Sequence, residues 1–457
     1  MANKVTYQKN QEFTGRVEDI TSQGQGVVKV DHYPFFIEGA ITDEVVKFKA
    51  MKVGKTYGFG RLIEIIEESP ERVEMKDPIG RQIGTMTLQH MSYDAQLTYK
   101  EQLVKSAFER IGHFENLDIR PVLGMENPWE YRNKAQIPVR EVKGQLETGF
   151  FRRNTHDLVP VENFFIQHKE IDEAIIIVRD ILRRYHVPAY NEKAHTGIVR
   201  HVIVKRGHYS GQVMVTLVTN KRKMPNEDII VHAIANEVPN VASIVQNVQT
   251  KRTNVILGRQ SLVLWGQPYI EDTMLDLTFR ISANSFYQVN TPQAEVLYKT
   301  AIEAAGLTGS ETVLDAYSGI GTISLSLAKH ANQVYGMDIV EESVDMAKQN
   351  AKLNGITNAS FEVGSAEEWL PKWNEEGIKF DVVVVDPPRK GLDQVFIDAL
   401  IEQQPEKIVY VSCNPATQAR DARLLADAGY EIQYVQPVDL FGQTTHVEAV
   451  ALLVKEQ

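Results

Sequence analysis

The last third of the chain alternates short apolar runs with amphipathic segments, and this order restricts the possible folds more than any other feature. The expected strands are 312–316, 333–338, 360–364, 380–385, 407–411 and 447–454. The expected helices between them are 324–330, 342–354, 396–403 and 416–428. Such alternation predicts a doubly wound α/β domain with a mostly parallel sheet. Ligands of these sheets bind beyond the carboxyl ends of the strands, so polar residues there are the candidates for function.

Two of these strand ends predict a site for a nucleoside ligand. The first strand runs into a loop with Tyr317, Gly319 and Gly321, where a ligand can approach the backbone closely, and Asp338 ends the next strand. A carboxylate in that position suits the hydroxyls of a ribose, although two glycines also occur in ordinary turns. The third glycine of a pyrophosphate-binding loop is missing, which argues against a dinucleotide.

A third strand end strengthens this prediction. Asp386 follows four valines and precedes Pro387 and Pro388. The prolines fix the backbone and remove two N–H donors, so we expect a stiff loop that aims Asp386 at the ligand. The three strand ends together suit an adenosine-bearing ligand without a diphosphate, and S-adenosylmethionine is the obvious candidate.

Cys413 is the only cysteine in the 457 residues, so the sequence offers neither an intrachain disulfide nor a set of thiolate ligands. It follows the expected strand 407–411 and precedes Asn414 and Pro415. A free cysteine is commonly a buried filler of the core, and the alternative is a nucleophile. Glu448 lies at the start of the last expected strand and should reach the same edge of the sheet; a surface carboxylate is its alternative reading.

A thiol, two carboxylates and a methyl donor suit one reaction. Carbon 5 of uracil is a poor nucleophile, but addition of a thiolate to carbon 6 turns carbon 5 into an enolate carbon that can attack a sulfonium methyl group. A carboxylate can then remove the proton from carbon 5, and elimination releases the thiol. Because a base stacked in a helix cannot reach such a site, we expect the target uridine to be flipped out or single-stranded.

Residues from 282 to the end resemble the RNA uracil-C5 methyltransferases of the RumA/TrmA type. The resemblance rests on the glycine loop and on the stretches 284–290, 386–389, 411–417 and 446–448. It implies that Cys413 is the nucleophile and that Glu448 accepts the proton. It also implies S-adenosylmethionine contacts from Gln288, Tyr317, Gly319, Asp338 and Asp386, and substrate contacts from Phe286 and Arg389. The alternative for Gln288 is a cap of the helix expected to start at Thr291.

The chain before residue 281 is expected to form two RNA-binding domains. Strand-like runs at 12–20, 26–30, 33–37, 44–50 and 57–67 predict a small closed barrel of the oligonucleotide-binding type over residues 1–66. The family resemblance identifies this barrel as a TRAM domain. Residues 67–280 are expected to form a central α+β domain, whose helix near 93–118 packs on the catalytic domain, 281–457. Solvated, lysine-rich hairpins are the alternative to RNA contacts in both domains.

One region departs from the family pattern. Many relatives hold an iron–sulfur cluster with four cysteines, three of them shortly before the position of Leu88 and one near that of Phe164. This chain has no cysteine at those places, so we expect no thiolate-held cluster and no metal site. Packing by Met86 and Phe164 is expected to replace the cluster.

The net charge of -11 leaves room for a nucleic-acid partner because of its distribution. Residues 282–457 hold 12 basic and 25 acidic side chains, whereas the rest of the chain holds 37 and 35. The barrel favours 23S ribosomal RNA, since the smaller transfer-RNA relatives typically lack it, and transfer RNA is the alternative substrate. A single cysteine and the lack of a long apolar run predict a cytoplasmic protein without membrane contact, and we expect a monomer.

Two further classes of function stay open at this point. One is a non-catalytic RNA-binding protein on the same fold, which would not need the set of Cys413, Asp386 and Glu448. The other is an amino- or N6-methyltransferase, which the Asp-Pro-Pro sequence would also suit but which needs no cysteine.

Overall fold

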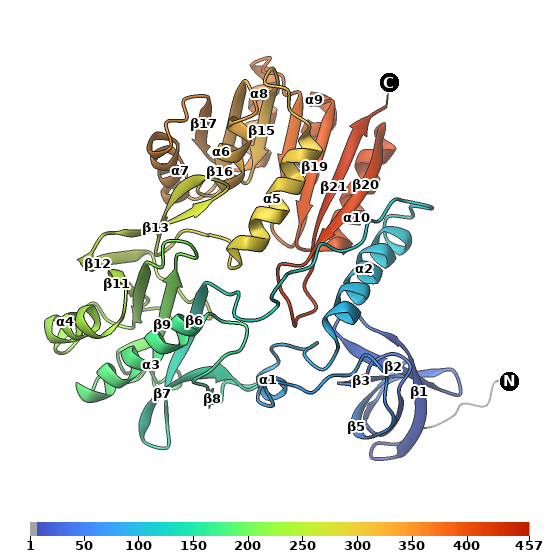
Figure 1. Ribbon diagram of the computed structural model, residues 1–457, viewed down its shortest axis with the longest axis vertical. Helices are drawn as coiled ribbons and strands as arrows, with labels where there is room; N and C mark the ends of the chain where they lie inside the picture. Colours follow the sequence, from blue (N-terminus) through green and yellow to red (C-terminus); the bar gives the residue numbers. More distant parts are fainter. Residues whose placement is uncertain (1–6, 457) are drawn as a thin grey trace.

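The N-terminal part of the chain is a closed barrel of five strands (Figure 1). The structure, a computed structural model, describes residues 7–456. The barrel strands follow the order β1-β2-β3-β5-β4, and inward side chains such as Val17, Phe35 and Phe48 form its core. The strands are β1 (Glu12–Ile20), β2 (Gln25–Val30), β3 (Tyr33–Glu38), β4 (Val45–Val53) and β5 (Gly58–Glu67). The predicted small barrel is therefore confirmed.

The central part of the chain is a seven-stranded mixed sheet with the order β12-β11-β10-β9-β6-β7-β8. Two helices, α3 and α4, pack on it, with Ile175, Val178 and Ile230 in the shared core. The elements are β6 (Lys134–Val142), β7 (Gln145–Phe151), β8 (Leu158–Pro160), α3 (Lys169–Arg184), β9 (Val199–Arg206), β10 (Val213–Thr219), α4 (Glu227–Glu237), β11 (Val241–Val248) and β12 (Gln260–Gly266).

The last part of the chain is a second seven-stranded sheet with the order β17-β16-β15-β18-β19-β21-β20. Its strands are β15 (Thr312–Ala316), β16 (Gln333–Asp338), β17 (Ala359–Val363), β18 (Val382–Val385), β19 (Lys407–Ser412), β20 (Tyr430–Val438) and β21 (Glu448–Lys455). All neighbouring strands are parallel except β21, which runs antiparallel between β19 and β20. This arrangement confirms the predicted doubly wound α/β fold.

Helices cover both faces of this sheet. Those helices are α5 (Thr291–Ala305), α6 (Thr322–Ala328), α7 (Glu341–Leu353), α8 (Ala366–Glu375), α9 (Gln394–Gln403) and α10 (Pro415–Asp427). Alternate valines of β18 point to opposite faces of the sheet. Val382 and Val384 pack on the face covered by α5, α6 and α7. Val383 and Val385 pack on the face covered by α8, α9 and α10. A strand buried on both faces explains why its sequence is continuously apolar. A hairpin of β13 (Tyr269–Met274) and β14 (Leu277–Ser282) lies against α7.

Helix α2 (Tyr93–Arg110) joins the N-terminal half to the last sheet. Ser92 caps its start by accepting a hydrogen bond from the backbone of Ala95, and the helix ends at Arg110 rather than near residue 118. Gly112 and the left-handed backbone of His113 follow the end and prevent further helical turns. The helix packs against α10 and β20, as Figure 1 shows, and Phe108 enters the core of the last sheet.

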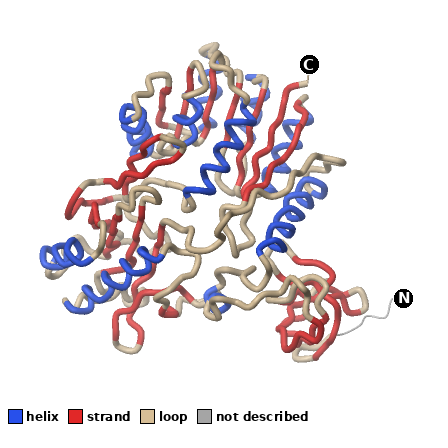
Figure 2. Tube along the Cα trace, viewed as in Figure 1, coloured by secondary structure: helices blue, strands red, loops and turns tan. Residues whose placement is uncertain are grey.

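The connection between the barrel and α2 is almost all loop, apart from the short α1 (Gly80–Ile83) (Figure 2). Met86 and Phe164, both buried, pack here with Tyr131, Ile83 and Ile166. Met86 and Phe164 therefore pack in one hydrophobic cluster, as expected, and their replacing an iron–sulfur cluster stays a prediction. Among residues 7–456, no group of His, Cys, Asp and Glu could hold a metal ion, and no helix is long and apolar enough to cross a membrane. The domain boundaries proposed from the sequence stay a prediction.

Candidate active site

The strand register brings the polar strand ends to one edge of the last sheet. Parallel pairing places the ends of β15, β16, β18 and β19 at that edge, because Ala316 pairs with Met337 and Val385. β21 runs the opposite way, and Ser412 pairs with Ala449. The first residue of β21, Glu448, therefore lies beside the residue that follows β19, Cys413.

Cys413 is half-buried in the turn between β19 and α10. Asn414 caps α10 by accepting a hydrogen bond from Ala416 N at 3.2 Å. Its Nδ2 donates to the carbonyl oxygen of Arg389 at 2.9 Å and so ties this turn to the loop after Asp386. Burial raises the pKa of the Cys413 thiol, and the nearby Glu448 and Asp386 add to it, whereas Arg389 opposes the shift. The thiol and the two carboxylates are therefore close neighbours.

Both carboxylates of this group are held in an unfavourable environment for a charge. Glu448 is 5% exposed, and burial together with Asp386 raises its pKa to about 8. Burial raises the pKa of Asp386 to about 7. Neither side chain has a hydrogen-bond partner in the part of the chain that the structure describes. Perturbed carboxylates without structural partners are typical of catalytic sites.

The loop before Glu448 is fixed by buried polar contacts with α2. The ammonium of Lys100 lies 2.6 Å from Asp439 Oδ1, and both side chains are fully buried. Tyr93 donates from its hydroxyl to Asp439 at 2.8 Å. Gln96 Nε2 donates a hydrogen bond to Gln443 Oε1 at 2.9 Å, and the backbone N–H of Gln443 donates to Gln96 Oε1 at 2.9 Å. These contacts position the loop from a helix more than three hundred residues earlier in the chain.

His446 lies within this loop, next to Arg389. Its Nδ1 is 3.4 Å from a guanidinium nitrogen of Arg389. Burial, together with Arg389, Lys100 and Arg132, lowers the pKa of His446 to about 4, so the ring is neutral at pH 7. A neutral imidazole can accept a hydrogen bond from Arg389 and orient the guanidinium toward Cys413.

The glycine loop and the end of β16 fit an adenosine group. Gly319 N donates to Asp338 Oδ2 at 3.1 Å, and Tyr317 holds a left-handed backbone with φ of 75°. A Cβ atom on Gly319 would meet no atom within 4 Å, so the space above the loop is open. Ile339, which the sequence reading missed, is 72% exposed directly after Asp338 and offers an apolar surface beside that carboxylate.

Gln288 is buried and forms a hydrogen bond with Tyr298, a residue that also senses the charge of Asp386. It does not cap α5. Asn290 does so instead, by accepting from Gln293 N at 3.4 Å. The alternative role of Gln288 as a helix cap is therefore wrong, and its place beside Tyr298 leaves it near the Asp386 strand end.

No described contact joins Phe286 to Cys413. Its ring is 62% exposed and lies 5.9 Å from the ammonium of Lys134. Lys205, on the neighbouring strand, donates to the carbonyl oxygens of Ser282 and Ser285 at 2.7 and 2.8 Å and so holds the loop that carries Phe286. Burial, with Arg132 nearby, lowers the pKa of Lys134 to about 8. Lys134 has no carboxylate partner among residues 7–456, and the sequence reading missed it.

Comparisons with known proteins identify the family of this chain. The family model described as tRNA (uracil-5-)-methyltransferase matches residues 92–456. A protein of Enterococcus faecalis described as an uncharacterized RNA methyltransferase is 52% identical over 98% of both chains. One from Halalkalibacterium halodurans with a similar description is 50% identical over 97% of both chains.

A solved structure gives a match over the whole fold. The crystal structure of the Pyrococcus abyssi tRNA (uracil-54, C5)-methyltransferase in complex with S-adenosyl-L-homocysteine superposes with a TM-score of 0.77 at 29% identity. The match covers 96% of this chain and 99% of that one. The chain therefore belongs to the tRNA (uracil-5-)-methyltransferase family and is an S-adenosylmethionine-dependent RNA methyltransferase, as the sequence predicted.

Proposed function

We propose that the protein transfers a methyl group from S-adenosylmethionine to carbon 5 of a specific uridine in 23S ribosomal RNA. One observation supports the chemistry most strongly: the pairing of β19 with β21 sets Cys413 and Glu448 side by side, with Asp386 and Arg389 as their neighbours. A non-catalytic RNA-binding protein would gain nothing from a thiol and two carboxylates held together without structural partners.

The cofactor would bind along the edge formed by β15, β16 and β18. Asp338 would accept hydrogen bonds from the ribose, the open backbone at Tyr317 and Gly319 would face the cofactor, and Gln288 and Asp386 would contact its remaining polar groups. S-adenosylmethionine, when bound, supplies an electrophilic methyl group on a sulfonium. The protein residues need only hold the uracil ring with carbon 5 toward that methyl.

The first step forms a bond between Cys413 Sγ and carbon 6 of the uracil. Without substrate, burial and the two carboxylates keep the pKa of the thiol above its ordinary value. The thiol must still lose its proton to solvent before addition, and Arg389, whose charge and hydrogen bond oppose the rise in pKa, stabilises the thiolate. As the bond forms, the carbon 5–carbon 6 electron pair moves into an enolate over carbon 5, carbon 4 and O4.

The second stage removes the proton that carbon 5 carries after it has gained the methyl group. The Glu448 carboxylate takes this proton, the electron pair restores the carbon 5–carbon 6 double bond, and the bond to Cys413 Sγ breaks. The products are 5-methyluridine, a free thiolate, protonated Glu448 and S-adenosylhomocysteine, which is the leaving group of the methyl transfer. Burial serves Glu448 here, because a carboxylate with a raised pKa is a stronger base than an exposed one.

Two RNA classes compete as the substrate. The barrel is the sequence argument for 23S ribosomal RNA. This argument from the barrel is weakened because a tRNA methyltransferase matches this chain over nearly the full length of both proteins. Transfer RNA is accordingly the second candidate, and in either RNA the target uridine would be flipped out or single-stranded. We further propose that the protein acts as a monomer in the cytoplasm.

The test of this function uses two variants. Cys413→Ala should bind S-adenosylmethionine normally and transfer no methyl group, because the nucleophile is gone. Glu448→Gln should accumulate a covalent protein–RNA species that migrates slowly on a denaturing gel, because elimination needs the proton on carbon 5 to leave. Methyl transfer by Cys413→Ala at the wild-type rate would exclude the mechanism.

The substrate is identified with unmodified transcripts of 23S ribosomal RNA and of transfer RNA, each incubated with cofactor carrying a labelled methyl group. Label that appears as 5-methyluridine in one transcript identifies the RNA class. Label on an exocyclic amine would instead support the amino- or N6-methyltransferase alternative.

A further inference from the structure

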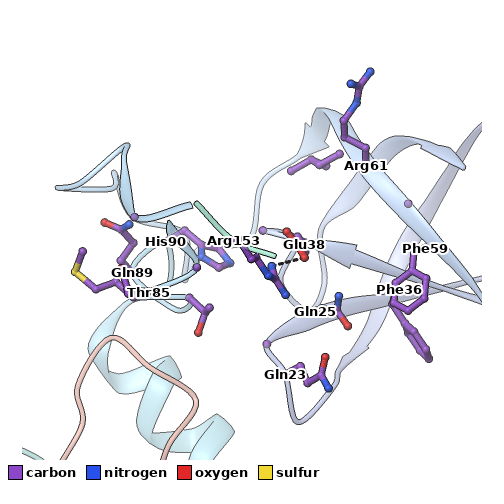
Figure 3. A pocket seen from close by; sticks show the side chains of 18 of the residues that line it. Gln23, Gln25, Phe36, Glu38, Phe59, Arg61, Thr85, Gln89, His90 and Arg153 are labelled. Atoms are coloured by element: carbon purple, nitrogen blue, oxygen red, sulfur yellow. Dashed lines mark hydrogen bonds and ion pairs between the residues drawn. The ribbon is translucent and has the colours of Figure 1, made fainter. Parts of the chain in front are cut away.

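A cavity of about 670 Å³ lies between the barrel and the segment that leads to α2 (Figure 3). Phe36, Phe59 and Arg61 of the barrel line one side of it, and Thr85 and Gln89 line the other. The volume falls within the roughly 300–1,000 Å³ typical of sites that bind a small ligand or part of a larger one. None of the residues proposed for methyl transfer lines this cavity.

The barrel side of the cavity is an aromatic surface outside the hydrophobic core. On β3, Phe35 and Ile37 point into the barrel, so Phe36 between them points out. Phe36 pairs with Phe59 of β5 across the two strands, and their ring centroids are 5.9 Å apart. Both rings are half-buried and contribute nothing to the barrel core. Aromatic rings in this position on a small barrel are typical surfaces for stacking unpaired bases.

Polar groups without protein partners surround this aromatic surface. Gln25 is only 7% exposed, yet its side-chain amide has no hydrogen-bond partner among residues 7–456. The hydroxyl of Thr85 is buried and also lacks one. Arg61 is exposed and forms no ion pair with a described residue, whereas Arg153 neutralises Glu38 at the edge of the cavity. Buried polar groups are nearly always satisfied, so these groups indicate a polar ligand.

The inner wall of the cavity contacts the loop that leads to Glu448. A Cβ atom on Gly24 would lie 3.1 Å from side-chain atoms of both Leu88 and Thr445, so the barrel turn touches that loop directly. Leu88 N also donates to the carbonyl oxygen of Gln443 at 3.0 Å. A chain of RNA that occupies the cavity would therefore pass close to the proposed site of methyl transfer.

We propose that this cavity binds an unpaired nucleotide of the substrate RNA other than the target uridine, with its base against Phe36 and Phe59 and its phosphate at Arg61. The inference rests on the proposed function for the identity of the RNA. The amide of Gln25 would meet the polar edge of the base. The cavity is then a second anchoring point that holds the RNA while the target uridine reacts.

The test measures binding to poly(U), a single-stranded probe that does not depend on the methylated sequence. The double variant Phe36→Leu/Phe59→Leu keeps apolar side chains and removes the stacking surface, so its Kd should rise about tenfold or more. Trp369→Leu, a partly exposed aromatic in the catalytic domain, is the matched control and should bind as the wild type does.

The charge of the site is tested separately. Arg61→Ala should make the slope of log Kd against log salt concentration shallower by about 0.7, the value for one phosphate contact on a single strand. Arg16→Ala removes another exposed barrel arginine, one that pairs with Glu67 outside the cavity, and should leave the slope unchanged. Ultraviolet cross-linking of poly(U) to the wild-type protein should label peptides of β3 or β5, which gives a readout that needs no variant.

The outcomes separate this inference from the proposed function. Wild-type affinity and salt slope in the cavity variants, with no cross-link on β3 or β5, would overturn the inference even if the protein methylates uracil. A protein that shows the expected binding changes but methylates no uracil would keep the cavity as an RNA site and overturn the proposed reaction.

Discussion

Replacing Lys100 by Met should loosen the loop that brings Glu448 to the site. The substitution keeps the length of the side chain and removes its charge. Lys100 and Asp439 are both fully buried at 2.6 Å, so Met leaves the carboxylate of Asp439 buried without its counter-ion. Removing one partner of a buried pair costs about 3–5 kcal/mol. Asp439 keeps hydrogen bonds from Tyr93 Oη and Phe441 N, so the lower end, about 3 kcal/mol, applies here.

This cost should appear as local opening of the loop. If about 3 kcal/mol falls on the loop alone, its open population rises about a hundredfold. Hydrogen exchange measured by mass spectrometry on peptides covering 439–447 reports this population. Lys105→Met is the matched control on the same helix, because Lys105 is about half-exposed and lies 4.0 Å from Glu109, and an exposed pair of that kind contributes about 0.5 kcal/mol or less.

Hydrogen exchange in the loop of Lys100→Met that is as slow as in Lys105→Met would contradict the expected cost of the unpaired Asp439 carboxylate. The double variant Lys100→Met/Asp439→Leu provides the second arm, since replacing both charges by apolar groups removes the unpaired carboxylate. That variant should recover most of the protection lost in Lys100→Met. Loss of protection equal to that of the single variant would show that the contact matters through shape rather than charge.

Three further results are expected. Because Glu448 must be ionised to act as the base, with a pKa raised to about 8, and Cys413 must lose its proton, kcat/KM should rise with pH from 6 to 9; a flat profile over that range would contradict these roles. Asp386→Asn should raise the Kd for S-adenosylmethionine in calorimetry by about tenfold, and an unchanged Kd would remove Asp386 from the cofactor site. Lys134→Met should raise KM for RNA with little change in kcat, because the unpaired ammonium beside Phe286 is expected to contact the RNA; an altered kcat alone would contradict this.

The sequence located the reacting groups because they follow strands of a parallel sheet. Cys413 and Asp386 each come directly after an apolar run, and parallel strands end at one edge, so their proximity followed from the pattern alone. Glu448 was expected at the same edge, but its place directly beside Cys413 depends on the insertion of β21 between β19 and β20, which nothing in a single sequence shows.

Other features had no local signal. Lys100 and Asp439 are 339 residues apart, and no periodicity links positions at that separation. Helix α8 contains Pro371, which weakens the helical pattern, and β20 is an edge strand whose pairing with β21 shifts register between Ile432 and Tyr434. The cavity beside the barrel depends on how the turn at Gly24 meets Leu88 and Thr445, and that contact exists only in three dimensions.

The place of β21 in the sheet determines when a nascent chain can bring Cys413 and Glu448 together. β20 leaves the ribosome first, yet it lies outside β21 and has no partner strand in the seven-stranded sheet until that later strand arrives. Cys413 is therefore translated well before the carboxylate that would release it from a pyrimidine. Completion of the sheet and delivery of Glu448 are a single event, so under the proposed mechanism an immature chain would form no adduct with RNA that it cannot resolve.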